Sequence, residues 1–341
     1  MTTTATEPVR RRVTVPVVAS LHAAGVTGLA VVAVLTGGET AVLLTLGLTA
    51  YGLGLRHAFD PDHIATIDNT TRRLVRTERD ARGVGLWFSL GHSTVVLVAA
   101  LLLTAGVRAL APLLDDEGSM LHRVTGVWGP LVAGTFLLVI GTVNVVLLRR
   151  ALRPADPGTV GRAGVPPSDR PVGGGPVTWL LRRVEWATDR PRRMYGVGLL
   201  FGLGFDTATS IGLLSIAAAT TLDHDSWYAA LPLALLFAAG MSLLDSAQGA
   251  VARRVYTSAR TTPHGRRRVR YDVVVTAVSA LAAFVIATVT LLQTLAEHVP
   301  AAAAVPGAAA NLDPYGVVLT VVLLAAWGTG ALVLRQSRRE A

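Results

Sequence analysis

Eight long apolar segments constrain this chain more than any other feature of its sequence. The hydrocarbon core of a bilayer is about 30 Å thick, and a helix needs about 20 apolar residues to cross it. The eight segments that reach this length lie approximately at 16–36, 40–64, 84–106, 126–148, 195–220, 227–252, 273–296 and 314–334. Only 16% of the 341 residues are charged, against about 25% in an ordinary soluble domain. We therefore predict an all-α integral membrane protein with eight transmembrane helices.

The positions of the arginines predict how these helices are oriented. All 31 basic residues are arginine, and 28 of them lie before the first segment, after the eighth, or in alternate connections. Cytoplasmic connections carry an excess of Lys and Arg, so both termini are predicted to be cytoplasmic. The net charge of +9 is then a topological signal, with arginines placed to contact anionic lipid, and it gives no support for nucleic-acid binding. We expect a multi-pass protein of the bacterial cytoplasmic membrane, surrounded by the lipid bilayer.

A connection rich in proline, glycine and arginine divides the chain into two halves. This connection, residues 149–193, has the composition of a flexible cytoplasmic linker. It separates an N-terminal membrane half, residues 1–148, from a C-terminal half, residues 194–341, and each half contains four of the predicted helices.

Two short patterns recur in both halves. Phe59-Asp60 in the second segment is echoed by Phe205-Asp206 in the fifth. The pattern Phe-Ser-Leu-Gly-His-Ser at 88–93 in the third segment is echoed by Phe-Ala-Ala-Gly-Met-Ser at 237–242 in the sixth. The predicted topology gives the paired segments opposite directions, so the patterns suggest an inverted repeat. Such repeats are typical of transporters, because one unit can rock against the other.

The second segment ends in a cluster of ionisable side chains, Arg56-His-Ala-Phe-Asp-Pro-Asp-His-Ile64. Such groups cost about 2.5–3.5 kcal/mol each at the centre of a membrane helix and usually mark a functional site. On a regular helix His57, Asp60 and His63 lie within an arc of about 120°, whereas Asp62 points elsewhere. Pro61 removes the hydrogen bond to the His57 carbonyl. The resulting kink could turn Asp62 inward and expose that carbonyl as a further ligand.

Imidazole and carboxylate ligands without sulfur suit a borderline divalent metal such as Ni²⁺ or Co²⁺, and the chain has no cysteine. The alternative is a solvated cytoplasmic end, in which Arg56 and Arg72 pair with the two aspartates.

Three further membrane residues are candidates for the same path. His92 in the third segment could supply an imidazole from a second helix, or could simply hydrogen-bond to a neighbouring helix. Asp206 and Asp245 are the formal charges of the fifth and sixth segments, and each is either functional or a structural partner of Ser or Thr. Asn144 is expected to hydrogen-bond between helices.

These motifs resemble the nickel/cobalt transporter family (NiCoT). Its His-x4-Asp-His signature is met by His57, Asp62 and His63, and its third-segment motif by Gly91-His-Ser-Thr-Val-Val96. Its fifth- and sixth-segment motifs are similar to Leu203-Gly-Phe-Asp-Thr-Ala-Thr209 and Gly240-Met-Ser-Leu-Leu-Asp245. The departures from the family pattern are Pro61 for the usual alanine, and Ser210 and Gln248 for two acids.

The resemblance implies high-affinity uptake of Ni²⁺ or Co²⁺ as substrate, without a resident cofactor. We assign coordination to His57, Asp62 and His63, and we expect Asp60 to be a further ligand or an acceptor for an imidazole N–H. His92 would complete or gate the site. Asp206 and Asp245 would neutralise the ion along its path through the second half.

Secondary transport is expected, because the chain has neither a lysine nor a Gly-x4-Gly-Lys-Ser/Thr phosphate-binding loop. One alternative is a nickel/cobalt efflux permease, although exporters often carry His-rich cytoplasmic tracts and residues 149–193 contain no histidine. The second is a membrane-embedded metalloenzyme, which is disfavoured because the polar residues are spread over four segments. We therefore expect a transporter and not an enzyme.

Overall fold

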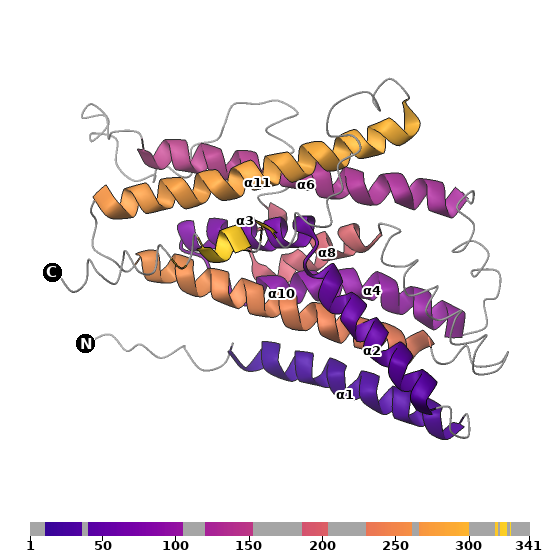
Figure 1. Ribbon diagram of the computed structural model, residues 1–341. Helices are drawn as coiled ribbons and strands as arrows, with labels where there is room; N and C mark the ends of the chain where they lie inside the picture. Colours follow the sequence, from indigo (N-terminus) through magenta and orange to yellow (C-terminus); the bar gives the residue numbers. More distant parts are fainter. Residues whose placement is uncertain are drawn as a thin grey trace, which may run out of the picture.

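The protein is a bundle of long helices in this computed structural model (Figure 1). The structure describes residues 11–35, 40–104, 120–152, 186–203, 230–260 and 266–299, with a few positions between 318 and 328. All regular structure within these ranges is helical. The elements are α1 (Arg11–Leu35), α2 (Thr40–His57), α3 (Pro61–Arg76), α4 (Val84–Thr104), α6 (Met120–Leu152), the 3₁₀ helix η3 (Pro191–Arg193), α8 (Met194–Gly202), α10 (Ala230–Arg260) and α11 (Arg266–His298).

Five of these helices, α1, α4, α6, α10 and α11, are long and apolar enough to cross a membrane. The pair α2 and α3 makes a sixth if it is one bent span, with an angle of 53° at the break. The expectation of a helical, multi-pass membrane protein is therefore confirmed. The predicted segments 195–220 and 314–334 fall largely outside the described residues, so the count of eight stays a prediction.

Helix α10 lies at the centre of the packing and contacts α1, α2, α3 and α4. Helices α6 and α11 pack along one another and cover α3 from the other side (Figure 1). Helix α8 packs against α4. This arrangement places α3 between the α6–α11 pair and α10.

The enclosure of α3 differs from the sequence-based expectation. The second membrane segment was predicted to end near residue 64 and to lead into a cytoplasmic connection that contains Arg72. The chain instead continues as a helix to Arg76, and Arg72 is only 3% exposed. The helix can hold this charge because the Arg72 guanidinium donates to Asp68 at 2.8 Å and to the Val275 carbonyl at 2.9 Å.

Two other buried side chains extend this network across helices. Tyr256 on α10 donates its hydroxyl to the second carboxylate oxygen of Asp68. Asn144 on α6 donates its amide to the Asn69 side-chain oxygen at 2.9 Å, which confirms its expected interhelical role. The polar face of α3 is therefore paired with side chains and carbonyls of α6, α10 and α11.

Candidate metal centre

The break between α2 and α3 creates the geometry of the site. Helix α2 ends at His57, three residues turn the chain, and α3 begins at Pro61. Proline fits the first helical position because its missing N–H has no helical partner there. The predicted kink is confirmed, but the His57 carbonyl accepts the Asp60 N–H at 3.0 Å. This carbonyl is therefore engaged within the turn, contrary to the expectation that the kink would expose it.

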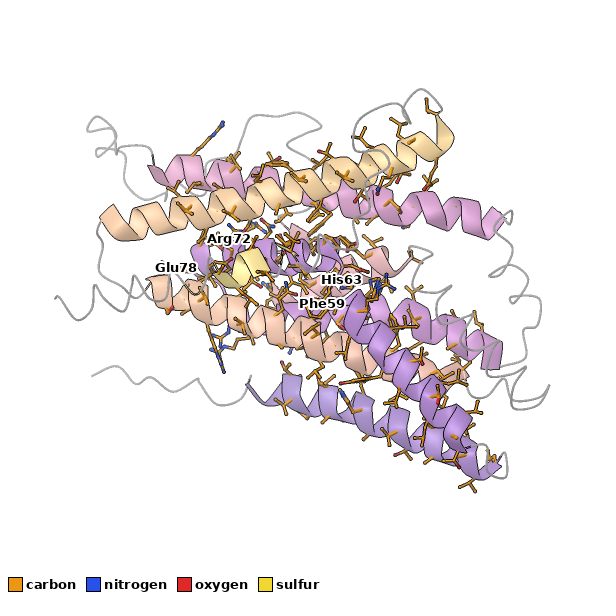
Figure 2. The ribbon with its side chains drawn as sticks, in the orientation of Figure 1. Phe59, His63, Arg72 and Glu78 are labelled. Atoms are coloured by element: carbon orange, nitrogen blue, oxygen red, sulfur yellow. The ribbon has the colours of Figure 1, made fainter. Side chains whose placement is uncertain are left out.

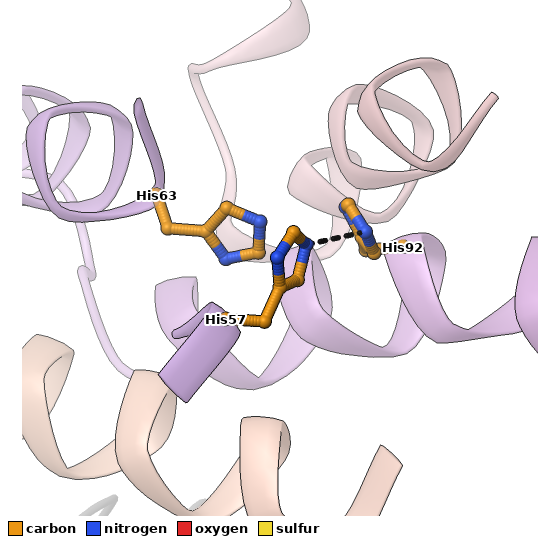
Figure 3. A group of neighbouring side chains, drawn as sticks. All are labelled: His57, His63 and His92. Carbon is orange, nitrogen blue, oxygen red and sulfur yellow. Dashed lines mark hydrogen bonds between the residues drawn. The ribbon is translucent and has the colours of Figure 1, made fainter. Parts of the chain in front are cut away.

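Three imidazoles from three helices meet at this break. His57 comes from the end of α2, His63 from the first turn of α3 and His92 from the middle of α4 (Figure 3). One ligand atom from each lies within 4.8 Å of the others. The Nε2 atoms of His57 and His92 are 3.1 Å apart and form a hydrogen bond. The three ring centroids are 4.7–4.9 Å apart, so the rings surround one small volume.

Two carboxylates lie against the outer nitrogens of these rings. Asp60 forms an ion pair with Nδ1 of His57, and an oxygen of Asp245 on α10 lies 3.4 Å from Nδ1 of His63. A carboxylate at Nδ1 fixes the orientation of an imidazole and raises the basicity of its other nitrogen, as in many metal sites. Nε2 of His63 has no hydrogen-bond partner among the described residues, so it is available to a ligand.

Asp62 lies in the first turn of α3. One of its carboxylate oxygens accepts the backbone N–H of His63 at 2.9 Å. A carboxylate at this position also suits the positive end of the helix dipole. Asp62 therefore directly precedes His63 in the chain, and one of its carboxylate oxygens is hydrogen-bonded to the α3 backbone.

The cluster is buried at one end and partly open at the other. His63 is 1% exposed and Asp245 0%, whereas His57 and Asp60 are 15% and 31% exposed. Phe88 packs edge-on against His63 with ring centroids 4.8 Å apart. Figure 2 shows His63 beside Phe59 at the break, and Arg72 and Glu78 toward the other end of α3. The more accessible side of the cluster is therefore that of His57 and Asp60.

Glycine allows α4 and α10 to approach closely at the cluster. A Cβ added to Gly85 of α4 would lie 1.9 Å from the carbonyl oxygen of Asp245, so no other residue fits there without a shift of the backbone. One turn further along α4, the hydroxyl oxygens of Ser89 and Ser242 are 2.7 Å apart and hydrogen-bonded. These contacts hold Asp245 beside the imidazoles that the N-terminal half supplies.

Comparison with known proteins identifies the family of the chain. A family model described as the high-affinity nickel-transport protein matches residues 43–333. The nickel transporter NicT of Mycobacterium tuberculosis is 38% identical over 95% of this chain and 88% of its own length. The chain belongs to the high-affinity nickel-transport family. The nickel transporter NixA of Staphylococcus aureus is 36% identical over 90% of each chain, and the cobalt transport protein NhlF of Rhodococcus rhodochrous is 36% identical over 86% of this chain and 83% of its own. No solved structure matches the chain.

Membership of the nickel-transport family confirms the resemblance found in the motifs and identifies a transporter, not an enzyme. Of the predicted site residues, the structure brings together His57, Asp60, His63, His92 and Asp245. Asp206 lies outside the described residues, as does Ser210. The alternative pairing of Arg72 with the aspartates of the cluster is wrong, because Arg72 pairs with Asp68.

Gln248 has a role that its motif position did not reveal. Its side-chain amide donates to the Ile64 carbonyl of α3 at 3.2 Å. An ionised acid, which the family pattern has nearby, could not donate this hydrogen bond. In this nickel-transport family member, position 248 therefore joins α10 to the first turn of α3, next to His63.

Sequence reasoning missed Asp68, the buried partner of Arg72. Its spacing of four residues from Arg72 is that of an ion pair on one helix face. Recognition of this spacing would have extended the second membrane segment beyond residue 64.

Proposed function

We propose that this protein carries Ni²⁺ or Co²⁺ into the cell across the cytoplasmic membrane. The observation that carries the proposal is the set of three imidazoles from three helices, two of which have a carboxylate at the outer nitrogen. Imidazole and carboxylate ligands suit Ni²⁺ and Co²⁺. The relatives named as nickel and cobalt transporters, which match most of the chain, support the same substrates.

We propose His57, His63 and His92 as the inner ligands. Two nitrogens that bind one ion at about 2.1 Å lie roughly 3.0–3.4 Å apart at angles of about 90–110°. The 3.1 Å separation of Nε2 in His57 and His92 has this spacing. Asp60 and Asp245 then act as carboxylate partners of the imidazoles, and Asp62 is a further oxygen ligand. Asp206 is retained as a proposed residue of the path in the second half.

We also propose that the two membrane halves, joined by residues 149–193, are inverted repeats. The segment Tyr-Gly-Leu-Gly-Leu at 51–55 of α2 recurs as Tyr-Gly-Val-Gly-Leu at 195–199 of α8. The recurrence supports a common origin for α2 and α8, in addition to the recurring pattern shared by α4 and α10.

The contacts of these segments also support the repeat, because α2 packs on α10 in the same way as α8 packs on α4. Helices α2 and α10 meet at two glycines. A Cβ atom added to Gly54 of α2 would lie 2.1 Å from the Phe237 carbonyl oxygen of α10. A Cβ atom added to Gly240 of α10 would lie 2.6 Å from the Tyr51 carbonyl oxygen of α2. The corresponding glycines where α8 meets α4 are Gly198 and Gly91. An added Cβ atom would lie 1.9 Å from the Phe88 carbonyl oxygen at Gly198, and 1.9 Å from the Tyr195 carbonyl oxygen at Gly91. Each unit thus packs its first helix against the second helix of the other. Units interlocked in this way can rock about a site between them.

The proposed topology has eight spans with both termini in the cytoplasm, as the arginine distribution predicts. An inside-negative potential then drives uptake. A doubly charged ion gains about 4.6 kcal/mol per 100 mV, which is sufficient for accumulation without ATP.

Accumulation of radiolabelled Ni²⁺ in cells that express the full chain tests the proposal. We expect His57→Ala to reduce accumulation by about tenfold or more, because it removes an inner ligand. His22→Ala is the matched control, since His22 hydrogen-bonds to Val18 and Tyr51 outside the cluster. Excess Co²⁺ should compete with Ni²⁺ in the wild type. Equal accumulation in wild type and His57→Ala would refute the site, and faster loss of preloaded metal with the wild type would identify an exporter.

A further inference from the structure

A cavity of about 500 Å³ lies where several helices begin, and none of the three clustered histidines lines it. Its lining comes from the start of α1, the connection between α3 and α4, the start of α4 and the residues around η3. The membrane-crossing parts of α1 and α4 begin at Val13 and Val84. The cavity therefore lies at the level where these helices enter the bilayer, which is the level of the lipid headgroups.

The charge that lines this cavity is positive. Four arginines and two aspartates contribute to the lining. Both aspartates are already paired, Asp80 with Arg82 at 3.3 Å and Asp189 with Arg79 at 3.3 Å. The guanidinium of Arg190 has no ion pair or hydrogen bond among the described residues, and that of Arg192 lies over the Trp87 ring, 6.0 Å from its centroid. Two guanidinium groups thus remain without a carboxylate.

The same cavity also has an apolar side. Val13, Leu86 and Trp87 line it. Of these side chains, Val13 is 46% exposed. A tryptophan next to arginines at a helix end is typical of the membrane interface. A ligand that fits both sides of the cavity has an anionic head and an apolar tail.

We propose that this cavity binds the phosphodiester headgroup of an anionic phospholipid, with its acyl chains along the exposed side of α1 that carries Val13. Guanidinium groups bind phosphate oxygens in paired hydrogen bonds. Basic pockets between helix ends are suited to anionic headgroups. A soluble phosphate has the same anionic oxygens, but it has no apolar part that could contact the apolar side of the cavity. The site is separate from the metal centre and does not depend on the substrate proposed above.

Native mass spectrometry of the purified full-length protein in detergent tests this proposal. The probes are phosphatidylglycerol and phosphatidylcholine with identical acyl chains, titrated separately. We expect the wild type to retain phosphatidylglycerol preferentially. The double variant Arg190→Gln/Arg192→Gln should bind it about 30-fold more weakly, which is about fivefold for each arginine removed near the membrane surface.

The matched control is Arg149→Gln/Arg254→Gln, which removes the same charge from two exposed arginines on α6 and α10 outside the cavity. It should bind phosphatidylglycerol as the wild type does. Equal weakening in both double variants would overturn the proposal, as would equal retention of the two lipids by the wild type. A third arm adds glycerol phosphate without acyl chains. Displacement of the lipid by an equimolar amount would overturn the assignment to lipid and indicate a soluble phosphate.

Discussion

At the scale of single residues, the ion pair of Asp68 and Arg72 shows how α3 tolerates burial. The two side chains are 1% and 3% exposed, so neither charge is solvated by bulk water. Asp68 also accepts the Tyr256 hydroxyl, and Arg72 donates to Val275 on α11. The pair therefore contributes to the packing of α3 against two other helices, and removal of one partner would leave the other charge uncompensated.

We predict that Asp68→Asn destabilises the protein by about 3–5 kcal/mol, the usual cost of breaking a buried pair. Thermal unfolding of the purified protein in detergent measures the effect. Arg79→Gln is the control, because Arg79 is 52% exposed and its pairing with Asp189 should contribute at most about 1 kcal/mol. The double variant Asp68→Asn/Arg72→Met should recover part of the loss, since no buried charge remains unpaired. Equal melting of Asp68→Asn and Arg79→Gln would contradict this role.

The residues of the candidate site could be predicted from the sequence, but the pairing of these residues with one another across helices could be predicted only in part. His57, Asp60, His63 and His92 were predicted to converge, and they do, because ionisable groups in apolar segments are rare enough to be conspicuous. The pairing of Asp245 with His63 could not be predicted, since it depends on how α3 packs against α10. Whether these residues bind the ion stays a prediction that the uptake experiment tests.

At the scale of elements, close helix packing depends on particular glycines. In α8, a Cβ at Gly198 would lie 1.9 Å from the Phe88 carbonyl and 3.0 Å from the His92 backbone nitrogen. Gly196, two residues earlier on the same helix, has no atom within 4 Å of an added Cβ. The two positions therefore separate the effect of close approach from the general effect of replacing glycine in a helix.

We predict that Gly198→Ala destabilises the protein by about 1–3 kcal/mol, because α8 must move away from α4. It should also reduce Ni²⁺ uptake, since the displaced backbone carries His92. Gly196→Ala should leave uptake unchanged and stabilise the helix by up to about 1 kcal/mol. Thermal unfolding and uptake measured on both variants check the pair. Wild-type behaviour of Gly198→Ala would show that the contact does not position α4.

Elements were predictable from the sequence where apolar runs or proline mark them. The long apolar helices and the kink at Pro61 follow from hydropathy and from the missing N–H of proline. Helix α3 was not predicted, because its polar residues from Thr66 to Arg73 are typical of a surface segment. Only the tertiary structure shows that α6, α10 and α11 supply partners for them.

At the scale of the whole molecule, the two proposed repeat units meet directly beside the histidine cluster. Ser89 of α4 belongs to the first unit and Ser242 of α10 to the second, and their hydroxyl oxygens are 2.7 Å apart. If transport requires one unit to rock against the other, a covalent bond at this contact should stop it. The natural chain has no cysteine, so an introduced pair has no competing thiols.

We predict that Ser89→Cys/Ser242→Cys forms a disulfide on oxidation, because the short distance between the two hydroxyls is compatible with an S–S bond of about 2.05 Å. Ni²⁺ uptake should then fall by about tenfold or more and recover when the bond is reduced. Each single variant, treated with the same oxidant, controls for the loss of the serine hydrogen bond and for oxidative damage. Mass spectrometry of peptides establishes that the bond has formed. Full uptake by the cross-linked protein would mean that α4 and α10 move together, and the motion that releases the ion would then have to lie elsewhere in the bundle.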